Sequence, residues 1–122
     1  MLALLPGHSL LSVAGFMETL ALANRLSPMR VFDCDCLTHD GRPVPSATGI
    51  ALPVAGGLDQ ARRGDVLLLC GSPDVPPQVQ VTMTRGLRMA ARHGVHCGGL
   101  DRGAEVLAQA GLLKGRTATT HW

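Results

Sequence analysis

The segment from residue 94 to residue 108 constrains the fold more than any other part of the chain. It begins with a short apolar run containing Val95 and Cys97, which is typical of a buried strand. Two glycines at positions 98 and 99 then permit a tight bend that side chains would block. Apolar residues at helical spacing follow, so we predict a helix that begins near Asp101 or Arg102. This strand–turn–helix elbow places Asp101 at the edge of a sheet where open α/β folds bind ligands.

Two roles are open to Asp101 at this point. Aspartate is a favoured N-cap, and its negative charge complements the helix dipole. A carboxylate at the mouth of a sheet can also line a ligand pocket, and one residue can serve both purposes. The residue type alone favours the cap, which is the commoner role.

Strand-like apolar runs alternate with helical stripes along the rest of the chain. We predict strands over 1–5, 30–38, 65–70 and 94–97. We predict helices over 13–26, 78–93 and about 101–110, with Ser12 as the first N-cap and Gly111 as the last C-cap. Segment 39–54 is expected to form a short hairpin excursion, 56–63 a loop or single helical turn, and 117–120 an extended piece.

The alternation predicts an α/β fold with a mainly parallel sheet. Right-handed crossovers then place the ends of three strands, after Leu5, Cys70 and Cys97, along one edge of that sheet. The loops that follow these strands, at 6–7, 71–72 and 100–101, are therefore expected to converge.

Composition narrows the classes of function. The chain has 122 residues, of which 46% are hydrophobic, enough for one domain with a real core. Aromatic residues make up only 2%, which argues against a platform that stacks single-stranded nucleic acid. The formal net charge of +2 is too small to imply a polyanionic partner. Arg85, Arg88 and Arg92 share one helical face, and we interpret that face as solvated.

The four cysteines show no C-x-x-C spacing, so we predict neither a metal site nor a redox cofactor. Free buried thiols are the expectation for Cys34, Cys36, Cys70 and Cys97, and they indicate a cytoplasmic protein. The first residues lack a basic segment and are too short for a signal peptide or a membrane span.

Several motifs in order along nearly the whole chain carry a family likeness. They lie at 5–7, 9–11, 17–20, 23–27, 65–71, 98–104, 108–113 and 116–122, the last ending in Ala-Thr-Thr-His-Trp. With them the chain resembles the ThiJ/PfpI superfamily, which has the class I glutamine amidotransferase-like fold. More closely, it resembles the N-terminal sensing domain of AraC-type transcriptional regulators. This likeness implies a three-layer, flavodoxin/Rossmann-like sheet with helices on both faces and the elbow at Asp101.

The resemblance also implies roles for individual residues. Enzymes of the superfamily carry a cysteine at the elbow, an acidic residue on the first helix and a histidine nearby. The likeness places Asp101 at the cysteine position, Glu18 at the acidic position and His121 at the histidine. A thiol at a helix N-terminus can become a nucleophilic thiolate, whereas a carboxylate is a much poorer nucleophile. We therefore predict that thiol-dependent catalysis is absent and that the chain is not an enzyme.

The regulator likeness implies a small-molecule effector, a homodimer and DNA binding through a C-terminal helix-turn-helix part. We expect residues 1–122 to form one sensing domain that is incomplete at its C-terminus, with no DNA-binding domain and no membrane contact. Losing the last elements of the domain would leave apolar faces uncovered, so we also expect self-association.

The main hypothesis is a non-catalytic sensing pocket. Glu18 and Asp101 would face one cleft and attract a cationic or zwitterionic metabolite, such as an amino acid or a betaine-like compound. Backbone N–H groups of the glycines would meet its anionic end. Trp122 is either a cation–π partner or a partly buried ring near a chain end. The candidate ligand-binding residues are Glu18, Gly71, Ser72, Gly99, Asp101, Arg102 and His121.

The alternative is an enzyme. A ThiJ/PfpI-like hydrolase or lyase would use Asp101 and His121 as an acid–base or nucleophile pair, with Glu18 as the orienting group. A lone histidine such as His121 is more often structural. A pure interaction scaffold is disfavoured, because such a protein needs no glycine turns converging at strand ends.

Overall fold

Short apolar runs form a five-stranded, fully parallel sheet in the computed structural model, which describes residues 1–121. Its order is β3-β2-β1-β4-β5, and all three residues of central β1 are buried. The registers align Leu4 with Cys70 and Cys70 with Leu100, so three strands end side by side. The strands are β1 (Leu2–Leu4), β2 (Cys36–Thr38), β3 (Gly56–Gly57), β4 (Val66–Cys70) and β5 (His96–Leu100).

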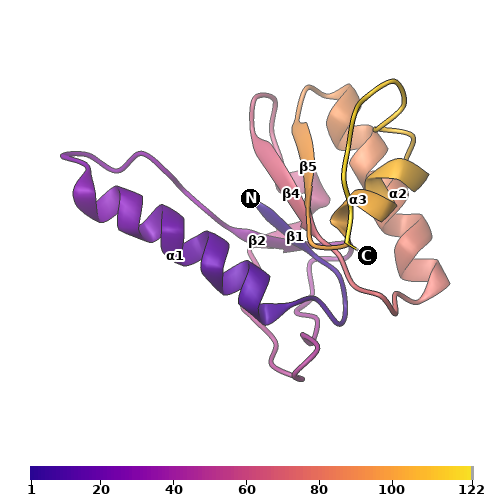
Figure 1. Ribbon diagram of the computed structural model, residues 1–122, viewed down its shortest axis with the longest axis horizontal. Coiled ribbons are helices and arrows are strands. Elements are labelled where there is room, and N and C mark those ends of the chain that lie inside the picture. Colours follow the sequence, from indigo (N-terminus) through magenta and orange to yellow (C-terminus); the bar gives the residue numbers. More distant parts are fainter. Residues whose placement is uncertain (122) are drawn as a thin grey trace.

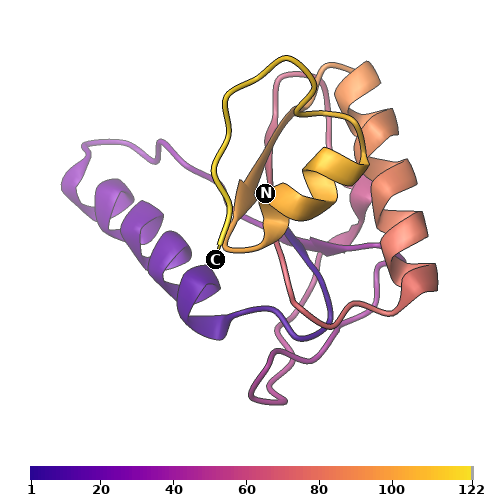
Figure 2. The ribbon, with the colours of Figure 1, turned by 45° about the vertical axis from the view of Figure 1, so that its right-hand side comes forward.

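Helices cover both faces of this sheet, as expected from the alternation in the sequence (Figure 1). Helix α1 (Leu10–Leu26) lies on one side, and α2 (Pro77–Arg92) and α3 (Gly103–Gln109) lie on the other. The turned view in Figure 2 shows the same separation. A single 3-10 turn, η1 (Leu58–Gln60), follows β3. The structure is thus the three-layer α/β fold that the resemblance implies.

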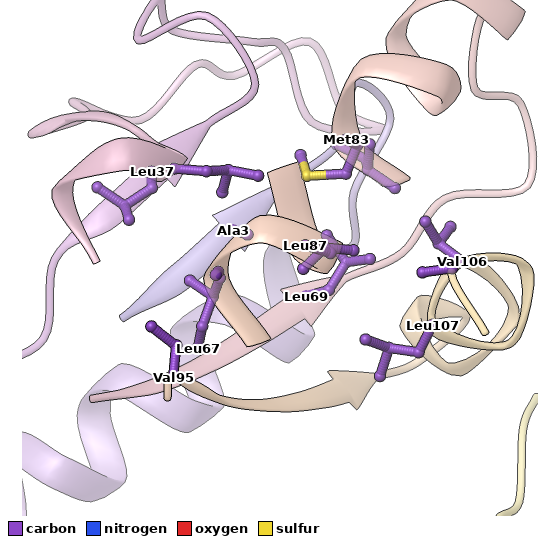
Figure 3. Packing of buried hydrophobic residues seen from close by; sticks show 13 residues of the cluster. Ala3, Leu37, Leu67, Leu69, Met83, Leu87, Val95, Val106 and Leu107 are labelled. Atoms are coloured by element: carbon purple, nitrogen blue, oxygen red, sulfur yellow. The ribbon is translucent and has the colours of Figure 1, made fainter. Parts of the chain in front are cut away.

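The larger core lies between the sheet and helices α2 and α3 (Figure 3). Met83 and Leu87 of α2 are fully buried there, because apolar residues recur on one face of this helix. They pack against sheet residues such as Leu67 and Leu69 and against Leu107 of α3. This core fixes α3, and therefore the elbow in front of it.

The smaller core lies under α1. Val13 is the one residue of α1 that is fully buried, and Phe16 and Met17 are partly buried beside it. These residues meet Leu2, Leu4, Cys36 and Cys70 on the opposite face of the sheet.

Two expectations for the first half of the chain are wrong. Helix α1 begins at Leu10, because the hydroxyl of Ser9, not Ser12, is the cap and accepts a hydrogen bond from the N–H of Ser12 at 3.2 Å. The strand predicted over 30–38 is confined to β2. The side chain of Asn24 accepts the N–H groups of Val31 and Phe32 at 2.8 and 2.9 Å, which holds this part of the chain out of the sheet.

The glycine pair before the elbow is also placed differently from the prediction. Gly98 and Gly99 belong to β5, and the turn falls at Asp101 and Arg102 instead. The predicted hairpin excursion is reduced to one antiparallel bridge between Pro45 and Ala51, and the segment 117–120 is not a strand. Strand β3 was not predicted, because two glycines carry no strand signal. None of the helices within residues 1–121 combines the length and the apolar character needed to cross a membrane.

Candidate functional site

The backbone at the elbow adopts an unusual conformation at Asp101. Asp101 has a φ of +53° and is the one non-glycine residue of positions 1–121 in the left-handed region. That conformation costs most L-residues about 1–2 kcal/mol, and Asp and Asn tolerate it best. The N-cap of α3 is Arg102, so the interpretation of Asp101 as an N-cap is wrong. Strain of this kind collects at functional sites, and a sharp strand-to-helix turn exposes its side chain above the sheet.

A junction of three glycines brings α3 directly onto the ends of β4 and β5. A Cβ atom on Gly71 would lie 2.2 Å from the carbonyl carbon of Arg102, and one on Gly103 would lie 2.0 Å from the oxygen of Leu69. A Cβ on Gly99 would lie 2.6 Å from the nitrogen of Ala104. The glycines are therefore required by backbone-to-backbone contact. The N–H of Gly71 already donates to the carbonyl of Leu100 at 3.3 Å.

The side chains of Asp101 and His121 lie close together at the elbow, although the two residues are distant in sequence. The Nε2 atom of His121 lies 3.7 Å from Oδ1 of Asp101, and the side chains are 39% and 23% exposed. This separation is longer than a hydrogen bond, so the pair attracts mainly when His121 is protonated. The predicted proximity of these two residues is therefore present in the structure.

Arg102 turns toward its own helix. Its guanidinium donates to both carboxylate oxygens of Glu105, at 2.8 and 3.2 Å. The hydrogen bond and charge of Glu105, followed by the charges of Asp101 and Asp74, raise the pKa of Arg102. One carboxylate, that of Glu105, thus binds the arginine directly, and the charges of Asp101 and Asp74 act on it from nearby.

The polar residues on the neighbouring strand ends are buried. Ser72 is buried, and its hydroxyl lies 2.6 Å from where a Cβ on Gly7 would be. His8 follows β1 and is fully buried, with Nδ1 2.9 Å from the carbonyl of Leu5. Its Nε2 makes no hydrogen bond to the described residues. His8 was missed as a candidate, although a polar residue directly after the first strand was a visible signal.

Glu18 does not join this group through any direct bond. Its side chain is exposed on α1 and forms no hydrogen bond or ion pair within residues 1–121. Trp122, for which a cation–π contact and a partly buried ring were both open, lies outside the described residues. The five cavities described on this surface lie elsewhere, and none is lined by Asp101, Glu18 or His121.

The thiol beside the elbow is unsuited to nucleophilic attack. Cys70 ends β4 and is fully buried, with its Sγ 3.9 Å from the carbonyl of Ser9. Burial, followed by the negative charge of Asp101, raises the pKa of Cys70 to about 11. The thiol therefore stays protonated at neutral pH. Within the described residues, no group of three or more His, Cys, Asp or Glu side chains is arranged to hold a metal ion.

Comparison with known sequences finds relatives along almost the whole chain, although no protein-family model matches it. The chain is 37% identical over 119 residues to the HTH-type transcriptional regulator CdhR of Pseudomonas aeruginosa, covering 98% of this chain and 35% of that protein. It is 34% identical over 118 residues to an uncharacterized protein in the cpoL 5′ region of Streptomyces lividans, covering 95% of this chain and 82% of that protein. A shorter match, 33% identical over 81 residues, joins it to an isonitrile hydratase of Pseudomonas putida and covers 66% of this chain and 36% of the enzyme.

Solved structures repeat this pattern. An AraC family transcriptional regulator from Pseudomonas putida matches with a TM-score of 0.82 at 31% identity, over 94% of this chain and 62% of that one. A ThiJ/PfpI family protein from Pseudomonas syringae matches with a TM-score of 0.72 at 22% identity, over 100% of this chain and 50% of that one, which shows the shared fold. The chain spans about a third of the length of the curated regulator it matches.

Proposed function

The chain belongs to the ThiJ/PfpI superfamily, and from that premise we propose that it is the non-catalytic, small-molecule-sensing domain of an AraC-type transcriptional regulator. The observation that carries this proposal is the carboxylate of Asp101 on a left-handed elbow, the position to which the resemblance assigns the thiol of the superfamily's enzymes. A carboxylate there is ionised and acts as a charge for recognition more readily than as a nucleophile. The nearest thiol, Cys70, is buried and protonated.

The effector class follows from the charges at the elbow. Glu105 binds Arg102 directly, and Asp101 and Asp74 add negative charge near it. Three carboxylates near one guanidinium favour a cationic group in a ligand. We therefore propose a cationic or zwitterionic metabolite, such as an amino acid or a betaine-like compound, with Asp101 as its principal anionic contact.

The remaining candidates belong to neighbouring elements. Ser72 and His8 are buried polar residues at the adjacent strand ends. Gly71 and Gly99 form the junction beneath α3. Glu18 is exposed on α1 and is proposed as a second anionic contact for the effector.

The partners follow from the same proposal. In this view residues 1–122 sense the effector in a cytoplasmic homodimer, and DNA is bound by a helix-turn-helix part outside these residues. The similarity to CdhR, an HTH-type transcriptional regulator, supports this division.

A second candidate function has one observation in its favour. The Asp101–His121 pair is close enough for proton exchange through small movements, and the isonitrile hydratase similarity shows that an enzyme is among the relatives. A hydrolase or lyase using Asp101 and His121, oriented by Glu18, would require both groups for turnover.

Calorimetric titration with a panel of amines, betaines and amino acids tests the proposal. We expect at least one compound to bind the unmodified chain, and Asp101→Asn to weaken that binding by about tenfold or more because a charge-assisted contact is lost. Asp33→Asn is the matched control, since it removes the same charge from an exposed ion pair with Arg30.

The same compounds incubated with the chain separate sensing from catalysis. A sensor returns them unchanged. Consumption of a bound compound that stops in Asp101→Asn would overturn the sensing proposal in favour of the enzyme. Absence of binding across the whole panel would overturn the assignment of a cationic or zwitterionic effector.

A further inference from the structure

The largest hollow described on the molecule lies away from the elbow. It has a volume of about 700 Å³ and lies between η1 and α2, on the face of the sheet opposite to α1. Pockets that hold small organic molecules have volumes of about 300–1,000 Å³. This hollow will be called the α2 cavity.

The floor of the α2 cavity is apolar and is made possible by a glycine. Leu58, Met89 and Ala90 line it. A Cβ on Gly86 would lie 2.5 Å from Cδ1 of Leu58, so the missing side chain lets η1 approach the helix there. Glycine is unfavourable inside a helix, so its presence at this position is explained by the close contact with Leu58.

The rim of the α2 cavity is basic. Three arginines line it, namely Arg62, Arg63 and Arg85, against the single acid Asp59. Arg62 donates to the backbone carbonyl of Asp59. Arg63 and Arg85 are exposed and form no ion pair with any residue in the described range 1–121. The rim therefore holds two cationic groups that the protein itself does not neutralise.

Two histidines add to this rim. His39 lines the cavity with a side chain that is only 18% exposed, and its Nδ1 makes no hydrogen bond to the described residues. The nearest acid is Asp40, whose Oδ1 lies 3.7 Å from that nitrogen. An enclosed ring nitrogen without a bond needs a partner to offset its desolvation. His93 supplies a second imidazole from the end of α2.

The other arginines of α2 do not line the α2 cavity as Arg85 does. Arg88 donates to the carbonyls of Ala110 and Gln109, at 2.9 and 3.0 Å, and so caps the end of α3. Arg92 lies outside the α2 cavity. The basic face seen in the sequence is thus divided between a structural cap and a cavity rim.

We propose that the α2 cavity is a second binding site, which takes a small organic anion with an apolar body. The acid group of the ligand would meet Arg63 and Arg85, and its apolar part would cover Leu58 and Met89. The concave shape and apolar floor favour such a ligand over a nucleic-acid backbone, which needs charge alone. This proposal does not depend on the elbow or on the proposed effector.

Three probes separate the contributions of charge and apolar surface. Octanoate carries both, octanamide keeps the apolar chain without the charge, and acetate keeps the charge alone. In NMR titrations of the chain we expect octanoate to bind at least about tenfold more tightly than either of the other two. Its shifts should centre on the amides of 58–63 and 82–93. The proposal would be overturned if octanamide or acetate bound as tightly as octanoate. It would also be overturned if the chemical-shift changes centred on other residues.

Matched variants test the rim. Arg85→Gln and Arg63→Gln should each weaken octanoate binding by about fivefold to tenfold, whereas Arg92→Gln should leave it unchanged within twofold. All three arginines are exposed, and the dispersion of the amide spectrum reports that each variant is folded. If Arg92→Gln weakened octanoate binding as much as the other two variants, the effect would be one of general charge, and the proposed binding site would be wrong. Random duplex DNA that displaces octanoate would assign the rim to nucleic acid instead.

Discussion

The two faces of the sheet are covered in different ways. On one face, α2 and α3 contribute Met83, Leu87, Ala90, Val106 and Leu107 to a continuous buried core. On the other, α1 is one residue longer than α2 but has Val13 as its single fully buried residue. Leu11 and Leu26 of α1 are 84% and 79% exposed.

The difference shows that helix length and apolar content do not determine how firmly a helix is held. Helix α2 is apolar on one side and polar on the other, so packing that one side against the sheet buries its apolar face. Helix α1 has apolar residues on several sides and can bury only one of them against this sheet. Val13, Phe16 and Met17 hold it on the sheet, and the bonds of Asn24 tie its C-terminal part to the following loop.

The largest expected effect tests this comparison with one leucine from each face. Leu87→Ala should lower the free energy of unfolding by about 2–5 kcal/mol, because it opens a cavity in the main core. Leu22→Ala on α1 should lower it by at most about 1 kcal/mol, because Leu22 is already half exposed. Urea unfolding followed by circular dichroism measures both. Equal losses would mean that α1 is as firmly packed as α2.

A smaller effect is expected from alkaline pH, through the thiol under α1. Burial raises the pKa of Cys70 from 9.0 to about 11. Below pH 9 the thiol is protonated in both the folded and the unfolded chain, so its contribution to stability is fully present. Between pH 9 and 11 the unfolded chain loses the proton first, and about 2–3 kcal/mol of stability should be lost.

Unfolding free energies measured at several pH values check this prediction. Cys70→Ala should be less stable than the unmodified chain at pH 8 but should show a shallower decline above pH 9. A decline of the same steepness in both proteins would mean that α1 opens enough for water to reach Cys70.

The smallest effect on stability comes from the exposed apolar residues of α1, and here the readout is association. Leu11→Gln and Leu26→Gln should each change stability by less than about 0.5 kcal/mol, because their side chains bury little area. They should nevertheless reduce concentration-dependent self-association in sedimentation experiments, since exposed apolar patches promote contact between molecules. Val81→Gln is the control, as Val81 is exposed on α2. Loss of association in that control, or a monodisperse unmodified monomer, would contradict the prediction.

Elements that bury a continuous or regularly spaced apolar surface could be predicted from the sequence. The run at 65–70 became β4, and the stripe through Met83 and Leu87 became α2. The strand predicted over 30–38 was too long, because alternation at Val31 and Phe32 does not reveal that Asn24 bonds to their backbone. The glycines of β5 were interpreted as a turn, because the contact with α3 that requires them is visible only in three dimensions.

The candidate site was only partly accessible to sequence reasoning. The position of Asp101 at an elbow and its proximity to His121 were predicted. Glu18 was predicted to face a cleft with Asp101, but neither residue lines any of the five cavities described, and residue spacing does not encode how α1 packs. The α2 cavity was not predicted either, because Arg63 and Arg85 are distant in sequence and meet only through the crossover between η1 and α2.

The left-handed backbone at Asp101 also limits how the carboxylate could be exchanged for the thiol that the resemblance assigns to this position in enzymes. Aspartate codons reach cysteine codons by single-base steps through either glycine or tyrosine. Glycine adopts a positive φ without penalty, whereas a bulky aromatic residue does not. A gene evolving between the two chemistries would therefore pass through glycine at this position, with neither a charge nor a nucleophile at the elbow.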